Sequence, residues 1–295
     1  MISYFQAIVI GLLQGVTELF PISSLGHSVL IPALLGWDDI SKAQSQESFY
    51  LAFLVALHVA TAIALLIYFR ADWVRIIGGF FHTLRTRKVE TPDQRLAWLL
   101  VVATIPAGLT GLLLEHTLRT QFAKPLSAAI FLTINGVILL LGEWYRRRAS
   151  VQSLVATHEQ AHSDSETGRR LDTLEYREAG VVGVAQIGAL FAGVSRSGIT
   201  MVAGLARGLD HEDAARFSFL LATPIILAAG LYKLPDFFGS LGDGVRGQAL
   251  AGSVAAGIAA YFSVRFLMRF FETQTLWPFA IYCLVVGGAC IVRFA

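Results

Sequence analysis

Glutamate, histidine, serine and arginine residues occur at two breaks in otherwise apolar stretches of this chain. The first break, residues 14–27, reads Gln-Gly-Val-Thr-Glu-Leu-Phe-Pro-Ile-Ser-Ser-Leu-Gly-His. The second, residues 193–198, reads Gly-Val-Ser-Arg-Ser-Gly. A carboxylate or an imidazole can serve as a general acid or base, and a guanidinium binds phosphate oxygens bidentately. Because ionisable groups are costly inside a bilayer, we interpret both breaks as functional.

The carboxylate of the first break is Glu18. Gln14 lies four residues before it, so the two side chains share one face of a helix. Glu18 is a candidate general base or ligand of a divalent cation; the alternative is a packing carboxylate paired with Arg196. Gln14 is a candidate hydrogen-bond partner or weak metal ligand, and the alternative is a structural hydrogen bond between helices.

The second half of this break predicts the start of a new helix. Pro21 is expected to end the preceding helix, and Ser23 or Ser24 to cap the next one. That helix carries His27 on its first turn, where an imidazole can act as acid or base near neutral pH. The alternatives are that the serines serve as caps alone and that His27 bonds a backbone carbonyl.

Arg196 is the cation of the second break, with Ser195 and Ser197 on either side and Gly198 after it. We favour phosphate binding, because a guanidinium forms paired hydrogen bonds with phosphate oxygens and backbone amides at helix starts add donors. The alternatives are an arginine that reaches the membrane interface and one paired with a structural carboxylate.

The composition indicates one integral membrane domain over residues 1–295. Of the 295 residues, 55% are hydrophobic and 15% charged, and the mean hydropathy is +0.62. Long apolar runs favour a polytopic all-α protein over a membrane β-barrel, and a formal charge of +2 gives no argument for nucleic acid as a partner. Without a basic leading region, the N-terminus is not expected to be a cleaved signal peptide. No cysteine–histidine cluster has zinc spacing.

About six transmembrane helices and two re-entrant helical hairpins are predicted from the apolar runs. Three runs are too short to span alone, and we pair them with neighbours across the two breaks to form the hairpins. The runs fall at about 2–20, 22–36, 49–70, 97–115, 125–145, 179–192, 198–208, 214–232, 247–268 and 276–293.

Basic residues set the expected orientation. Residues 71–96 form a basic amphipathic segment and residues 146–178 a polar loop, and we expect both on the cytoplasmic side, with the end that carries Arg265 and Arg269. Both termini and the connections at 37–48, 115–124 and 233–246 then face outside.

The two hairpins match at an offset of 172 residues. Three spans separate the copies, and an odd number of spans inverts the second copy. The chain is therefore expected to form an inverted-topology repeat, with halves of about 1–145 and 179–295 whose broken helices meet at the midplane. Matching pairs are Gly11 and Gly183, Gln14 and Gln186, Ile22 and Val194, Ser23 and Ser195, Gly26 and Gly198, and Gly36 and Gly208.

With these motifs in place, the sequence resembles the bacterial undecaprenyl-pyrophosphate phosphatases, the bacitracin-resistance membrane family, over essentially its whole length. Both breaks match the family's signatures, as do the stretches at 105–107, 217–224 and 278–282. It departs from the pattern in two places. Gln14 stands where a glutamate is common, which weakens a two-carboxylate metal site, and Ala192 replaces a proline before the second break.

The resemblance implies removal of the terminal phosphate from a C55 polyprenyl pyrophosphate. It implies a bacterial inner-membrane protein with a site open to the periplasmic side and a dependence on a divalent cation, Mg²⁺ or Ca²⁺. Ser24 would be the nucleophile or its helper, and Arg196 the phosphate clamp. His27 would be the acid or base, and its place three residues after Ser24 on the same helical turn suits the base that a serine nucleophile needs. Glu18 and Gln14 would organise the metal. Further substrate contacts would come from Ser23, Gly26, Ser195, Ser197 and Gly198.

Competing interpretations come from the same residues. Inverted repeats with polar midplane tips are also typical of transporters or flippases, which need an anion binder but not a nucleophile with a base. A structural scaffold would leave Glu18 and Arg196 without a purpose. His58, Thr61 and Asn135 are interpreted as polar contacts between helices. Small residues around 252–257 and 287–288 permit close helix contact within the chain or in a homodimer.

Overall fold

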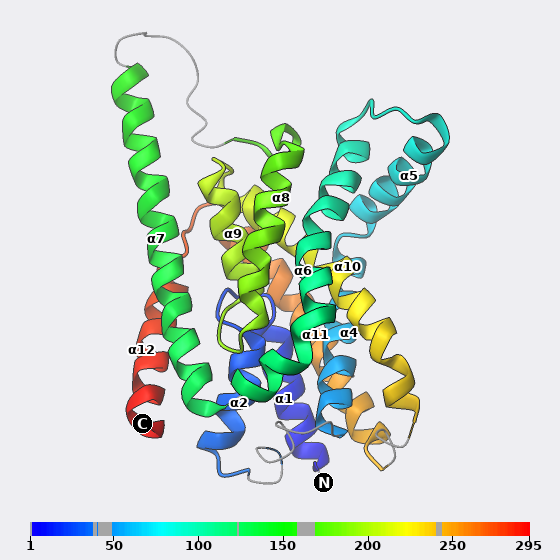
Figure 1. Ribbon diagram of the computed structural model, residues 1–295, viewed down its shortest axis with the longest axis vertical. Coiled ribbons are helices and arrows are strands. Elements are labelled where there is room, and N and C mark those ends of the chain that lie inside the picture. Colours follow the sequence, from blue (N-terminus) through cyan, green and yellow to red (C-terminus); the bar gives the residue numbers. More distant parts are fainter. Residues whose placement is uncertain (1, 38–39, 41–48, 123, 158–168, 240–243) are drawn as a thin grey trace.

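The computed structural model describes residues 2–37, 40, 49–122, 124–157, 169–239 and 244–295, and these residues form helices joined by turns (Figure 1). The all-α prediction is confirmed. The helices are α1 (Tyr4–Thr17), α2 (Ser24–Leu34), α4 (Phe49–Tyr68), α5 (Arg70–Thr86), α6 (Pro92–Phe122), α7 (Pro125–Thr157), α8 (Tyr176–Ala185), α9 (Arg196–Ala206), α10 (His211–Phe238), α11 (Arg246–Phe271) and α12 (Trp277–Phe294), with short 3₁₀ turns η1 (Leu171–Thr173) and η2 (Gln186–Leu190).

Five described helices, α6, α7, α10, α11 and α12, are long and apolar enough to cross a membrane. A sixth span comes from α4 if the bent pair of α4 and α5 counts as one, since the two helices meet at 89°. A polytopic membrane protein with about six spans is therefore confirmed. The shorter apolar helices α1 and α2 are the two arms of the first predicted hairpin.

The two hairpins have the same local structure 172 residues apart. Helix α2 covers residues 24–34 and α9 covers residues 196–206, so their bounds differ by that offset. Each is followed by a glycine with positive φ, 68° at Gly36 and 89° at Gly208, as is usual just past a helix end. Figure 1 shows α1 and α8 approaching the middle of the molecule from opposite ends.

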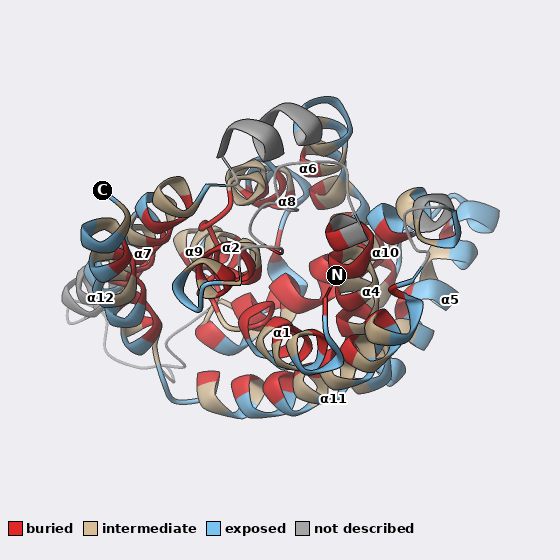
Figure 2. Cartoon of the chain, turned by 90° about the horizontal axis from the view of Figure 1, so that it is seen from below, coloured by how far each residue is buried: buried red, intermediate tan, exposed pale blue. Residues whose placement is uncertain are grey.

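Close backbone contacts hold each hairpin against a long helix of the other half. Helix α1 packs on α11, where a Cβ on Gly11 would lie 2.2 Å from the carbonyl oxygen of Gly252. Helix α8 packs on α6, where a Cβ on Gly183 would lie 2.5 Å from the carbonyl oxygen of Ala103. The small residues predicted to permit close contact around Gly252 are therefore used within the chain. Buried residues concentrate where these helices meet (Figure 2).

Three predicted connections are wrong in part because the helices run on past the apolar stretches. The connection predicted at 233–246 is helical through Phe238 in α10. Residues 115–124 were expected to be a loop, but α6 continues to Phe122. The predicted polar loop 146–178 is helical through Thr157 in α7 and again from Tyr176 in α8, and residues 158–168 of it lie outside the described residues. Charged side chains end a hydrophobic run, but the helical backbone still satisfies its own hydrogen bonds in water.

The basic segment at 71–96 is also helical, as α5 and the first turn of α6. Asp72 ties α5 to α10, because Arg216 donates to its Oδ1 at 2.7 Å. Trp98 Nε1 donates to Thr83 Oγ1 at 2.8 Å and ties α5 to α6. Figure 1 shows α5 and the end of α7 at one end of the molecule and both termini at the other. The predicted connection at 37–48 lies largely outside the described residues.

Candidate active site

The helix that leads into the first break ends four residues earlier than predicted. Helix α1 ends at Thr17, and turns fill the residues up to Pro21, which follows the helix instead of ending it. Ser23 is the N-cap of α2 and its hydroxyl accepts from Gly26 N at 3.2 Å, as Ser195 accepts from Gly198 N at 3.1 Å at the start of α9. Both glycine amides, which were expected to bind substrate, are therefore engaged in the caps.

The two hairpin tips, residues 18–26 from the end of α1 into the first turn of α2 and residues 191–198 from the end of η2 into the first turn of α9, touch at glycine residues. A Cβ on Gly26 would lie 2.9 Å from Cα of Gly193, and Gly193 N donates to Ser23 Oγ at 3.2 Å. Gly193 has a φ of 115°, and a Cβ there would lie 2.4 Å from the carbonyl oxygen of Ala128 in α7. A glycine is required at this position because no other residue combines that backbone angle with the space available.

Glu18 is the centre of the polar cluster between the tips. Its Oε1 accepts from Arg196 Nη2 at 2.6 Å, which brings the two candidate residues together across 178 positions of sequence. Its Oε2 accepts from Gln14 Nε2 at 3.1 Å, from the Ser24 hydroxyl, and lies 3.3 Å from His58 Nε2. The Glu18 side chain is 6% exposed, so these partners replace water around a buried carboxylate.

The structure pairs the Ser24 hydroxyl with Glu18 and not with His27. The Oγ of Ser24 donates to Glu18 Oε2, which places a carboxylate where a base for a serine nucleophile must lie. The two hydrogen bonds of the His27 ring go elsewhere, from Nδ1 to the carbonyl oxygen of Ser23 at 2.7 Å and between Nε2 and Tyr282 Oη at 2.8 Å. His27 therefore bonds a backbone carbonyl in the first turn of α2, which was the alternative interpretation, and it also lies beside Ser24 in the site.

One amino group of Arg196 lacks a described partner. Nη2 binds Glu18, but the buried Nη1 has no hydrogen-bond acceptor within the part of the chain that the structure describes. A buried charged donor left unsatisfied is costly. The Nη1 group is thus available to an anion that enters the cluster, as a phosphate clamp requires.

The serines beside Arg196 hold the two tips together. Ser197 Oγ donates to the Phe20 carbonyl at 3.3 Å and lies 3.0 Å from Ser195 Oγ. Asn135 of α7 completes the link, because its Nδ2 donates to the Pro21 carbonyl at 2.9 Å and its Oδ1 accepts from Ser195 N at 2.9 Å. Asn135 was predicted as a contact between helices, but it connects the backbones of both tips.

His58 and Tyr282 were missed as site residues. His58 Nδ1 lies 2.8 Å from the Leu54 carbonyl and its Nε2 faces Glu18, so α4 contributes a fourth group to the carboxylate, after Arg196, Gln14 and Ser24. An imidazole in an apolar run is a functional signal in its own right, and we had interpreted it only as a contact between helices. Tyr282 gives no such signal, because a tyrosine near the end of a span also serves as an interfacial anchor.

The predicted metal ligands do not form a resident metal site. Both oxygens of Glu18 already accept hydrogen bonds, and the Gln14 amide turns its NH₂ group toward that carboxylate. Within the described residues, no three histidine, cysteine, aspartate or glutamate side chains lie together as metal ligands. The residues present therefore do not fit a divalent cation held by the protein alone.

A small pocket opens beside Ser24 and His27 between α1 and α2. Its lining combines polar side chains of the Glu18 cluster with apolar side chains of both helices. Its lining residues are Ile10, Leu13, Gln14, Thr17, Ser24, His27, Ser28, Ile31 and Pro32.

Comparison with known proteins places the chain among relatives of its own length. The sequence is 57% identical over 340 aligned residues to undecaprenyl-diphosphatase 2 of Frankia alni, which covers 100% of this chain and 98% of the relative. It is 58% identical over 299 residues to undecaprenyl-diphosphatase of Mycolicibacterium paratuberculosis, with the same coverage. It is 47% identical over 293 residues to undecaprenyl-diphosphatase 2 of Burkholderia lata, covering 99% of this chain and 97% of the relative.

A family profile gives the same result. The profile described as bacitracin resistance protein BacA matches residues 7–289, which include both breaks, Asn135 and Tyr282. The tips, the Glu18 cluster and the spans that carry them thus lie inside one matched region, and the chain belongs to the bacitracin resistance protein BacA family.

Proposed function

We infer that this chain hydrolyses undecaprenyl pyrophosphate to undecaprenyl phosphate and inorganic phosphate. Its full-length relatives carry the name undecaprenyl-diphosphatase. The observation that carries the assignment is the convergence of Ser24 and Arg196 on Glu18 from the two tips. A hydroxyl, its base and a phosphate-binding cation then form one hydrogen-bonded group. The reaction recycles the lipid carrier of cell-wall synthesis and confers resistance to bacitracin.

Ser24 is the nucleophile of this proposal. Its Oγ attacks the terminal phosphorus while its proton passes to Glu18, the group to which it already donates. The bond between that phosphorus and the bridging oxygen breaks, undecaprenyl phosphate leaves, and the phosphoryl group stays on Ser24. Arg196 supports this step, since its Nη1 can donate to the oxygens on which negative charge develops.

Water completes the cycle. It attacks the phosphorus of phosphorylated Ser24 and gives a proton to His27, whose Nε2 carries none when Nδ1 donates to a carbonyl. The Oγ–P bond breaks, Ser24 regains its proton from Glu18, and His27 returns its proton to the departing inorganic phosphate. Ser23, Ser195 and Ser197 act by holding the tips in the geometry this reaction needs.

The proposal includes a divalent cation, Mg²⁺ or Ca²⁺, that binds together with the substrate as a complex with its pyrophosphate group. The protein groups do not fit a resident ion, and a pyrophosphate supplies several oxygens that such hard cations prefer. When bound, the cation would neutralise phosphate charge.

The site is proposed to open to the outer, periplasmic side of a bacterial inner membrane. The end with α5 and the end of α7 carries clustered arginines, which favour the cytoplasmic side. Membrane lipids surround the chain. A homodimer stays a prediction; Gly288 has no atom within 4 Å of an added Cβ, so it leaves room for close contact. Light scattering in detergent measures the oligomeric state.

Phosphate release from undecaprenyl pyrophosphate by the purified chain tests the function. We expect release that needs Mg²⁺ or Ca²⁺ and that falls on the order of 10²–10⁴-fold in Ser24→Ala and Arg196→Gln. Ser253→Ala and Arg293→Gln, which change a serine in α11 and an arginine at the end of α12, are matched controls and should keep wild-type rates. No release from folded wild-type protein would refute the enzyme and favour lipid or anion transport, measured in liposomes.

Acid-stable labelling separates the covalent step from direct attack by water. Rapid quenching of a ³²P-labelled reaction should leave phosphate on Ser24, and mass spectrometry of the peptide locates it. Full activity in Ser24→Ala would contradict the nucleophile assignment.

A further inference from the structure

We propose that Tyr282 is a proton relay in the reaction: its hydroxyl donates to the lone pair on Nε2 of the neutral His27 ring and accepts the proton of the water that attacks phosphorylated Ser24. The proposal rests on the hydrolysis inferred above and deepens it. Tyr282 lies on α12, 255 residues from His27, and its Oη lies 2.8 Å from His27 Nε2.

The hydrogen-bond partners decide which nitrogen of His27 carries the proton. Nδ1 lies 2.7 Å from the carbonyl oxygen of Ser23, and a carbonyl can only accept, so Nδ1 donates. In the neutral ring Nε2 is then an acceptor, and the Tyr282 hydroxyl donates to it. The partner of one ring nitrogen sets the state of the other, as in many catalytic histidines.

Ring packing fixes the orientation as well as the proton. The rings of His27 and Tyr282 lie 5.7 Å apart between centroids with 18° between their planes, so they are stacked as well as hydrogen-bonded. The His27 side chain is buried, whereas Tyr282 is 38% exposed. Tyr282 therefore covers the basic nitrogen of a buried histidine on the side where α12 faces the outside of the molecule.

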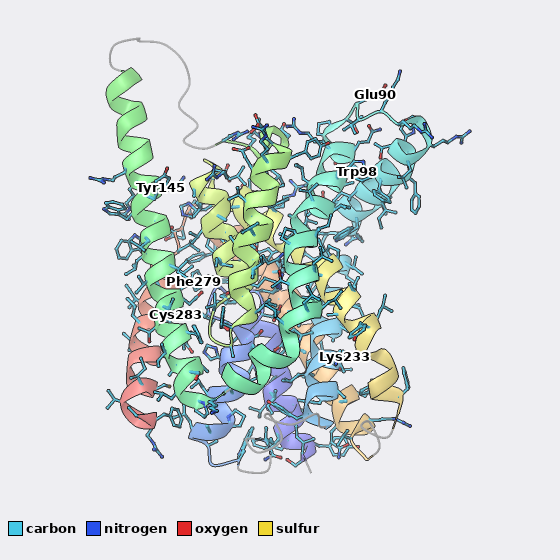
Figure 3. All side chains as sticks on the ribbon, in the orientation of Figure 1. Glu90, Trp98, Tyr145, Lys233, Phe279 and Cys283 are labelled. Atoms are coloured by element: carbon cyan, nitrogen blue, oxygen red, sulfur yellow. The ribbon has the colours of Figure 1, made fainter. Side chains whose placement is uncertain are left out.

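The neighbour of Tyr282 anchors this arrangement to the first tip. Cys283 accepts from Asn135 Nδ2 at 3.3 Å, and the same Nδ2 donates to the Pro21 carbonyl. Figure 3 shows Cys283 at mid-height of the molecule beside α7. A shift of α12 relative to the tip would thus move Tyr282 away from His27, so the hydroxyl is placed by packing and not by a flexible loop.

The consequence is a division of the site into two proton-handling pairs. Glu18 takes the proton of Ser24, whereas the water that releases phosphate gives its proton to the Tyr282 oxygen while the Tyr282 proton moves to His27 Nε2. Removal of the Tyr282 hydroxyl should slow that second step and leave substrate binding unchanged, because neither Arg196 nor Ser24 contacts Tyr282 through a described hydrogen bond.

Tyr282→Phe in the full-length enzyme tests the proposal, with Tyr232→Phe as the matched control because Tyr232 is 65% exposed on α10. We expect kcat to fall on the order of 10–100-fold with kcat/KM unchanged, because the slowed step follows the departure of undecaprenyl phosphate. In ¹⁵N-histidine spectra, the Nε2 signal of His27, assigned by its loss in His27→Gln, should move downfield in Tyr282→Phe alone.

The outcomes separate this proposal from the function itself. Wild-type kcat in Tyr282→Phe overturns it, and so does a loss of kcat without movement of the His27 signal, because that loss would be structural. An equal loss in Tyr232→Phe overturns it too. Inactive wild-type protein would instead refute the hydrolysis, while an unmoved Nε2 signal would still overturn the contact.

Discussion

Neutralising both Glu18 and Arg196 should restore the stability that either single substitution removes, without restoring activity. The perturbations are Glu18→Gln, Arg196→Gln and the double variant. The two side chains are 6% and 15% exposed and their atoms lie 2.6 Å apart, so each charge depends on the other. Removing one partner of such a pair costs about 3–5 kcal/mol, because it leaves a buried charge uncompensated. Replacing both by neutral groups of similar shape is close to neutral.

For a chain of this size that loss corresponds to a fall in melting temperature on the order of 10 °C, from about 2–4 °C per kcal/mol. Activity follows a different rule. Glu18→Gln removes the base of Ser24, so kcat should fall by about 10²–10⁴-fold, and the double variant should stay as inactive. Thermal unfolding in detergent, followed by tryptophan fluorescence, and phosphate release on the same preparations measure the two effects.

A second ion pair offers the control. Arg169 Nη1 donates to Glu178 Oε1 at 2.7 Å. The Arg169 side chain is 33% exposed and the Glu178 side chain 17% exposed, and the pair lies away from the tips. The same three substitutions there should leave kcat unchanged, whatever they do to the melting temperature, because the pair does not touch the site. If the double variant of the tip pair melts as low as the single variants, or if Glu18→Gln keeps wild-type kcat, the assignment of Glu18 is refuted.

Three further predictions concern the tips and the cation. Asn135→Leu leaves two buried backbone groups unpaired, so we expect a loss of about 2–4 kcal/mol in unfolding free energy and at least a tenfold fall in kcat, measured by thermal unfolding and phosphate release. Gly193→Ala should lower the free energy of unfolding by at least about 2 kcal/mol, because φ is 115° and the added Cβ would lie 2.4 Å from the Ala128 carbonyl oxygen. Gly288→Ala, where no atom lies within 4 Å of the added Cβ, should leave it nearly unchanged, and thermal unfolding measures both. Chelation should abolish activity reversibly, while plasma mass spectrometry of substrate-free enzyme should find less than about one Mg²⁺ or Ca²⁺ per chain, because the ion belongs to the substrate.

Local sequence signals predicted the parts of the site that short segments build. The Ser-x-x-Gly pattern predicted both capped half-helices, because an N-cap is a contact between residues three positions apart. The offset of 172 predicted that the tips would match, and the structure gives α2 and α9 bounds that differ by that number. Glu18 and Arg196 were identified by their cost in an apolar segment.

Parts of the site that depend on how helices pack could not be predicted in this way. Asn135 and Tyr282 reach the tips from α7 and α12, and periodicity in a helix that is apolar nearly all round does not say which face meets a particular neighbour. His58 had the signal of an ionisable group in an apolar run, but its partner lies 40 residues earlier on another helix. The partner of Ser24 was misassigned to His27 because nearness in sequence was taken for nearness in space.

The ends of the long helices could not be predicted from hydropathy either. Hydropathy reports where the apolar run stops, and α6 and α7 both extend beyond that point as helices. Backbone hydrogen bonds and tertiary packing set the end of a helix, whereas side-chain transfer energies set the edge of a span. The number of spans was therefore predictable while the lengths of their connections were not.

The division of charge between the tips ties folding to catalysis in this chain. Glu18 comes from the first half and Arg196 from the second, and each is buried with the other as its partner. A phosphate that enters must share Arg196 with Glu18, which is possible because Nη1 is unpaired in the described structure while Nη2 keeps the ion pair. Glu18 Oε1 thus keeps its contact with Arg196 while Oε2 stays hydrogen-bonded to Ser24. The Glu18 carboxylate stabilises the contact between the tips through Oε1 and serves as the base of Ser24 through Oε2. The fold and the reaction therefore use different atoms of the same side chain.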